Sequence, residues 1–157
     1  MNNVTINVEE VPPPIWSDNA LKFALKVLDE ITRENWELSI LFCGDKKMTE
    51  LNSQYRNKNE PTDILSFPLG ETINDSGKNI YFPGDIVISL DTLTENSKYF
   101  NISADEELRR LIIHGILHLN GMDHKTTDSS EPMLALQEEI LNKLKNERVM
   151  LSCGGEK

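Results

Sequence analysis

The sequence is poor in the residues that build a disulfide framework or a membrane segment. Its two cysteines, Cys43 and Cys153, lie far apart and form no Cys-x-x-Cys pair. This pattern argues against a disulfide scaffold and against a zinc site made of thiolates. No run approaches the roughly 20 apolar residues of a membrane-spanning helix, and the start, Met1-Asn2-Asn3, does not resemble a signal peptide. We therefore expect a cytoplasmic protein without a membrane partner, in which histidines carry any metal.

Basic residues are scarce relative to acidic ones. The chain has 16 lysines and arginines against 26 aspartates and glutamates, which gives a formal net charge of −10. Because contacts to phosphates normally supply much of the affinity for nucleic acid, this balance argues against such a partner. However, Lys46, Lys47, Arg56 and Lys58 cluster in the sequence, whereas acidic residues dominate the first predicted helix and the C-terminal third. They are either a local basic patch or ordinary solvated side chains, and the charge pattern alone does not choose between these interpretations.

The length and the apolar pattern predict one domain. A chain of 157 residues, 38% of them hydrophobic, is long enough for a single core, and we expect the domain to span 1–151 with a disordered tail at 152–157. Strands are predicted at 4–8, 36–42, 64–67 and 81–90, the last of them central because its apolar run is continuous. Helices are predicted at 17–33, from 45 onward, at 91–100, up to 119, and from 131 or 132 towards 150.

The order of these elements predicts the fold class. Strands and helices interleave, which is typical of an α/β (α+β) domain in which a small mixed sheet of about four strands packs against about five helices. The helix ending at 119 is apolar on most sides, so we expect it to be central. Ser17 and Asp91 are the predicted N-caps of the first and third helices, and Ser103 with Glu106 forms a capping box before the fourth. The polar stretch 68–79 is predicted to be a poorly ordered surface excursion.

All three histidines of the chain lie within residues 114–124, HGILHLNGMDH. On a helix, His114 and His118 project from the same face, and Gly121 allows a sharp turn that brings His124 back towards them. Three nitrogen ligands with one open position are typical of a catalytic zinc site. The histidine pair alone is equally compatible with hydrogen-bonded core residues. The third histidine, with Asp123 beside it as a carboxylate that could orient a ligand, favours a metal site.

Zinc peptidases that share this histidine spacing carry a glutamate directly after the first histidine, where it activates water. This chain has Gly115 at that position. A peptidase-like hydrolase therefore stays open as an alternative, but it lacks its usual base.

Two segments resemble the YbeY-type endoribonucleases, also called ribosomal RNA maturation factors. They are 51–68, LNSQYRNKNEPTDILSFP, and the histidine stretch 114–124, with a weaker third match at 84–89, GDIVIS. The resemblance implies a zinc-dependent enzyme, with one zinc ion per chain and no nucleotide cofactor, that cleaves single-stranded RNA. It further implies a role in maturation of ribosomal RNA of the small subunit and in ribosome quality control. Its metal ligands correspond to His114, His118 and His124, and its functional arginine corresponds to Arg56.

The chemistry of these residues agrees with that implication. Zinc held by imidazoles either provides hydroxide at neutral pH or polarises a phosphoryl oxygen while the RNA 2′-hydroxyl attacks, and both routes stay open. We assign catalytic roles to Arg56 and to the metal ligand His114. The guanidinium of Arg56 matches two phosphate oxygens and opposes the charge of the transition state. Arg56 and Lys58 are the predicted substrate-binding residues. Asp85 and Asp123 are the carboxylates to inspect for a general base, and neither is assigned that role. A ribosome-associated RNA-binding factor without catalysis is a further alternative.

Overall fold

The computed structural model of the chain describes residues 1–150 and shows a four-stranded sheet with five helices in that part of the chain. The elements follow the order β1 (Asn3–Val8), α1 (Ser17–Glu30), β2 (Glu37–Cys43), α2 (Asp45–Arg56), β3 (Ile64–Asp75), β4 (Lys78–Ser89), α3 (Leu90–Phe100), α4 (Ala104–Leu119) and α5 (Pro132–Lys143). The predicted mixed α+β class is thereby confirmed. The tail predicted at 152–157 lies outside the described residues.

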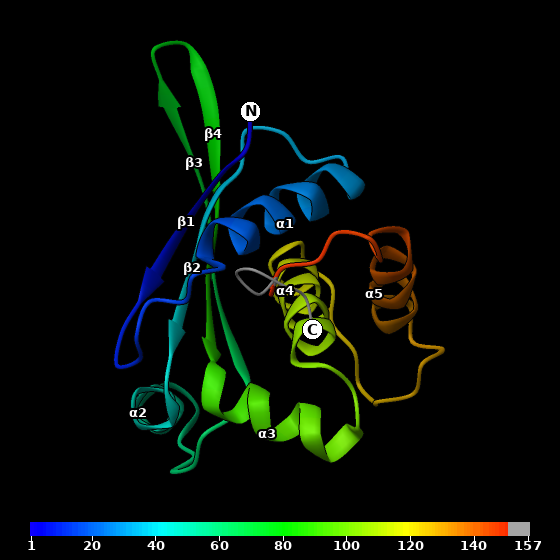
Figure 1. Cartoon of the computed structure of the whole chain (residues 1–157). Helices are drawn as coiled ribbons and strands as arrows, with labels where there is room; N and C mark the ends of the chain where they lie inside the picture. Colours follow the sequence, from blue (N-terminus) through cyan, green and yellow to red (C-terminus); the bar gives the residue numbers. More distant parts are fainter. Residues whose placement is uncertain (151–157) are drawn as a thin grey trace.

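The sheet has the strand order β1-β2-β4-β3. β1, β2 and β4 run parallel, and β3 pairs with β4 in the antiparallel direction. β4 is therefore flanked by strands on both sides, as its continuous apolar run predicted, and Ile86, Val87 and Ile88 are buried. α1 and α4 lie against the same face of the sheet, and α5 packs on the side of α4 away from it (Figure 1).

α4 is the central helix of the domain. It contacts α1, α3, α5, β3 and β4, and 11 of its 16 residues are buried. The helix packs tightly on the sheet at Gly115, where a Cβ atom would lie 2.9 Å from Cδ1 of Ile86 and 3.1 Å from Cδ1 of Ile64. This contact sets His114, the preceding residue, beside the start of β3. No helix among residues 1–150 has the length and apolar character needed to cross a membrane.

The prediction of a poorly ordered excursion at 68–79 is wrong. β3 continues to Asp75 and β4 begins at Lys78, so that the two strands form a long hairpin beyond the main sheet (Figure 1). Ser76 and Gly77 form the two-residue turn, both with positive φ, which suits the twist of a hairpin. The polar composition misled the prediction because residues 69–79 of this ribbon are exposed and need no alternating apolar face.

Helix termini agree with the sequence in part. Ser103 caps α4 as predicted, because its hydroxyl accepts a hydrogen bond from the Glu106 backbone N–H at 3.0 Å. Ser17 is not an N-cap but the first residue of α1. Ser89, rather than Asp91, caps α3. The first and last helices end at 30 and 143, earlier than predicted.

Candidate active site

A cleft of about 830 Å³ runs between β3 and the C-terminal half of α4. It brings together the histidine stretch, the end of α2 and the start of β3, which are distant in sequence. Its lining consists of Arg56, Thr62, Asp63, Ile64, Leu65, Ser66, Pro68, Leu69, Gly70, Tyr81, Pro83, His114, His118, Leu119, Gly121, Met122, Asp123 and His124. β3 is the edge strand of the sheet, so no further strand pairs with its outer edge.

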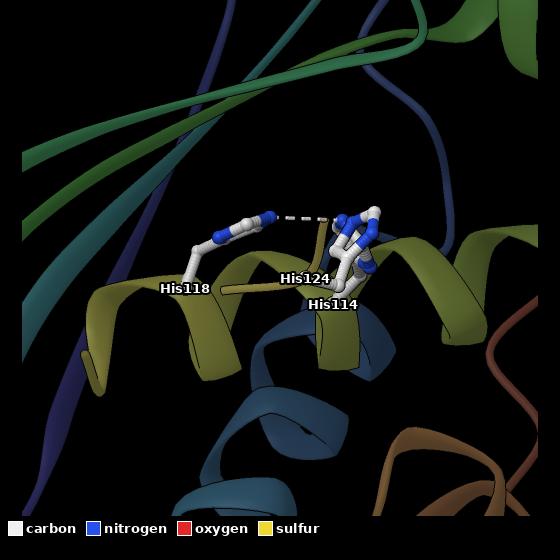
Figure 2. A group of neighbouring side chains, drawn as sticks. All are labelled: His114, His118 and His124. Carbon is white, nitrogen blue, oxygen red and sulfur yellow. Dashed lines mark hydrogen bonds between the residues drawn. The ribbon is translucent and has the colours of Figure 1, made fainter. Parts of the chain in front are cut away.

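The three histidine rings converge on one point in this cleft. His114 and His118 project from consecutive turns of α4, and Gly121, with φ of 90°, turns the chain so that His124 faces them (Figure 2). One ligand nitrogen from each ring lies within 4.8 Å of the other two. The Nε2 atoms of His114 and His118 are 3.1 Å apart. The structure thus brings the predicted ligands together.

Each ring presents Nε2 to the common point because its Nδ1 atom is already engaged. An oxygen atom that can only accept a hydrogen bond requires Nδ1 to carry the proton, which leaves the lone pair on Nε2. The three pairs are His114 with Oε1 of Gln137 at 2.7 Å, His118 with the Met122 carbonyl at 3.1 Å, and His124 with the Thr126 carbonyl at 2.8 Å.

The donor set fits a small divalent cation that prefers nitrogen ligands. Two Nε2 lone pairs directed at each other across 3.1 Å repel unless positive charge lies between or beside them. Zinc–nitrogen bonds of 2.0–2.1 Å in a tetrahedron place neighbouring nitrogens about 3.3 Å apart, which is close to that separation. His114, His118 and His124 are therefore the residues that would hold such an ion, and all three line the cleft.

Burial keeps these rings in the form that binds metal. Desolvation lowers the pKa of His114 and of His118 below the usual 6.5, and for His118 the neighbouring His114 lowers it further. A lowered pKa favours the neutral imidazole at neutral pH, and protonation sets in only on acidification. Since only the neutral ring offers a lone pair, both rings are ready to bind metal at pH 7.

Gln137 of α5 is a site residue that the sequence analysis missed. Its side chain is buried, and its amide is oriented because Nε2 donates to Glu138 at 3.0 Å while Oε1 faces His114. No motif marks this residue, because it lies 23 positions after His114 on another helix. The only available signal was a polar residue on the apolar face of a predicted helix.

Replacement of Gln137 by leucine is expected to weaken zinc binding about 10- to 100-fold, because the orienting acceptor of His114 is lost while three ligands stay. A competition titration with a chromophoric chelator measures the effect. Gln54→Leu, on the exposed side of α2, is the matched control and should bind zinc as the wild type does. Equal affinity in both variants would show that Gln137 does not orient the ligand.

The structure places Arg56 in the cleft and Lys58 outside its lining. Arg56 is the last residue of α2, and its guanidinium forms no hydrogen bond or ion pair with any residue of 1–150. Lys58 is exposed, and its backbone N–H donates to the Asn52 carbonyl at 3.2 Å. The guanidinium of Arg56 is therefore available within the cleft, and the substrate contacts of both Arg56 and Lys58 stay predictions.

The carboxylates considered in the sequence analysis lie in different places. Asp123 lines the cleft, 4.0 Å from Nδ1 of His118, and its side chain is 87% exposed. Asp85 lies outside the cleft lining and accepts a hydrogen bond from the Ser39 hydroxyl. Asp63, which the sequence analysis did not consider, lines the cleft at the start of β3. Asp63 and Asp123 are therefore the carboxylates that line the cleft with the histidines.

Gly115 explains why the peptidase base cannot simply be added here. This position points into the contact between α4 and the sheet, where Ile86 and Ile64 leave no room even for a Cβ atom without movement. A glutamate at 115 would therefore enter the core rather than the cleft.

These observations define the class as a small α+β protein with three clustered histidines that could hold a metal ion, in a cleft that is also lined by an arginine without a side-chain partner among residues 1–150. The particular family follows from comparison with known proteins: the family model for endoribonuclease YbeY matches residues 5–145. The chain belongs to the endoribonuclease YbeY family.

Individual relatives agree with this assignment. The endoribonuclease YbeY of Treponema denticola is 44% identical over 150 residues, which cover 92% of this chain and 95% of the relative. That of Borreliella afzelii is 45% identical over 130 residues, or 81% of this chain and 84% of the relative. A solution structure of a Thermotoga maritima protein superposes with a TM-score of 0.63 at 26% identity and covers 98% of this chain and 99% of its own. The fold is thus shared over almost the whole length.

Proposed function

We propose that the protein is a zinc-dependent, single-strand-specific endoribonuclease that acts in maturation of small-subunit ribosomal RNA and in ribosome quality control, in the cytoplasm. Membership of the endoribonuclease YbeY family supports RNA cleavage and ribosomal RNA processing. The observation that carries the proposal further is that the three histidines share one cleft with Arg56, whose guanidinium has no partner among residues 1–150. A metal site alone fits many hydrolases, whereas the arginine adds recognition of a phosphate.

The site residues have different proposed roles in binding metal and substrate. His114, His118 and His124 would hold the zinc ion, which when bound supplies Lewis-acid chemistry. Arg56 binds the phosphodiester through two N–H groups of its planar guanidinium, and its charge opposes the negative charge that grows in the transition state. Gln137 keeps the His114 ring in one orientation and one tautomer.

The shape of the site supports a flexible substrate. The histidines are half-buried between α4 and β3, so a phosphodiester has to enter the cleft to reach them. A single strand can bend its backbone into this recess, whereas the backbone of a duplex is held in a regular helix. The acidic character of the rest of the chain, with a net charge of −10, further opposes loose binding of RNA elsewhere on the surface.

Metal removal tests the proposal. Cleavage of an end-labelled single-stranded RNA that carries a small-subunit precursor sequence should stop after chelation and return when stoichiometric zinc is added. The same sequence in a duplex should resist cleavage, and casein should stay intact. Cleavage that persists after removal of metal would contradict zinc dependence. Chelator-sensitive cleavage of casein would instead support the peptidase-like alternative.

A further inference from the structure

A second, smaller cavity joins the cleft at its hairpin end. It has a volume of about 330 Å³ and shares Tyr81, Leu119 and Gly121 with the cleft. Its remaining lining residues are Arg33, Trp36 and Asn120. Asn120 follows the last residue of α4 and lies two positions after His118, so this pocket adjoins the metal site.

The walls of this pocket are aromatic and cationic, and they are held in place. The rings of Trp36 and Tyr81 lie 5.2 Å apart between centroids, and Cζ of Arg33 lies 5.5 Å from the centroid of the Trp36 ring. Nε of Arg33 donates to Oδ1 of Asn120 at 2.8 Å, which fixes the guanidinium above the indole. The Tyr81 backbone N–H donates to the Asn35 carbonyl at 2.8 Å and anchors the strand that carries the phenol.

We infer that this pocket binds one unpaired nucleobase of the RNA strand whose phosphodiester lies at the three histidines. The inference rests on the proposed function and names a base-binding site for the same substrate. Splayed bases of single-stranded RNA typically stack on aromatic rings and on the plane of an arginine guanidinium. Trp36 is buried and supports the exposed Arg33 from below, so the surfaces offered to a base are the guanidinium plane of Arg33 and the half-buried ring of Tyr81.

The polar groups of the pocket suit the edge of a base. The Asn120 amide directs its oxygen to Arg33, so its NH2 group is the end that can donate to a base acceptor. The terminal N–H groups of Arg33 are further donors beyond the one given to Asn120. A volume of about 330 Å³ lies at the lower end of the range for small-ligand pockets and is large enough for a nucleobase.

The position of the pocket gives the strand a path. Arg56, at the end of α2, and Asp63, directly before β3, line the cleft together with Leu69, Gly70 and Tyr81 of the hairpin. Residues 64–70 extend over about 20 Å of strand. An RNA chain that contacts Arg56 and the histidines in the cleft thus has the pocket of Arg33, Tyr81 and Asn120 within reach, because Tyr81, Leu119 and Gly121 line both.

An abasic scan tests the inference. A set of single-stranded RNA oligonucleotides, each lacking the base at one position around the cleavage point, is bound and cleaved by the zinc-loaded protein. We expect one position at which loss of the base weakens wild-type binding about 10-fold, within the range for base–aromatic stacking. Arg33→Ala and Tyr81→Ala should bind the intact oligonucleotide about as weakly as the wild type binds the abasic one. Removal of that base should then have no further effect on binding by either variant.

Arg33→Lys is the matched control because it keeps the charge and removes the planar guanidinium. It should behave as Arg33→Ala does; wild-type binding by Arg33→Lys would overturn stacking as the cause. A flat abasic profile in a protein that still cleaves RNA would overturn the pocket alone, whereas absence of binding and cleavage with every oligonucleotide would overturn the proposed function as well.

In a Trp16→Phe background, Trp36 fluorescence should change when the intact oligonucleotide binds, and should change less when the abasic one binds. This measurement checks the pocket without altering any of its residues.

Discussion

His114→Ala is expected to abolish zinc binding and RNA cleavage together. The ring supplies one of three converging nitrogens and is held by Gln137, so alanine leaves two ligands and an unpaired amide in the core. A bound metal stabilises transition-state charge by several kcal/mol, so its loss should lower the cleavage rate by about 1000-fold or more. Single-turnover cleavage and the zinc content of the purified variant measure the two losses in the same sample.

The melting temperature of the chelated wild type is the control for this substitution. If the variant melts near that temperature, the loss reflects the missing metal and not an unfolded chain. Unchanged cleavage by His114→Ala would point to a contaminating nuclease. A lowered melting temperature with weaker ribosome binding, and no cleavage by the wild type itself, would support the non-catalytic ribosome-associated alternative.

Arg56→Ala should lower kcat/KM for RNA by about 100- to 1000-fold, the loss usually caused by removing one group that stabilises a transition-state anion, while the zinc content stays at the wild-type level. The guanidinium lies exposed at the end of α2 and has no partner among residues 1–150. Its removal should therefore leave the free energy of unfolding within about 0.5 kcal/mol of the wild type. Cleavage kinetics with metal analysis and a denaturant titration measure these quantities.

Two further variants separate the geometry of Arg56 from its charge. Arg56→Lys should recover only part of the lost rate, because an ammonium group cannot donate in parallel to two phosphate oxygens. Lys46→Ala removes a positive charge from an exposed position near the start of the same helix and should leave kcat/KM unchanged. Equal losses in Arg56→Ala and Lys46→Ala would show that the net charge of this region, and not the arginine itself, governs the rate.

Local patterns in the sequence were sufficient for most of the fold. Helical spacing predicted that His114 and His118 share a face of α4, because a repeat of 3.6 residues depends only on neighbouring positions. The continuous apolar run of β4 likewise predicted a strand with neighbours on both sides. The hairpin at 68–79 was missed because its pairing involves exposed polar residues, for which composition resembles that of a loop.

The sequence by itself determined that three histidines are available as ligands, that two of them are one turn apart on a helix, and that Gly121 can turn the chain so that His124 returns. Each of these depends on residues close together in the chain. Only the tertiary structure decided which distant side chains meet them. Arg56 reaches the cleft because the loop after α2 leads into β3 beside α4, and Gln137 reaches His114 because α5 packs on α4. The pocket of Arg33, Tyr81 and Asn120 likewise arises from three segments. Such contacts follow from packing of the core, which no local periodicity encodes.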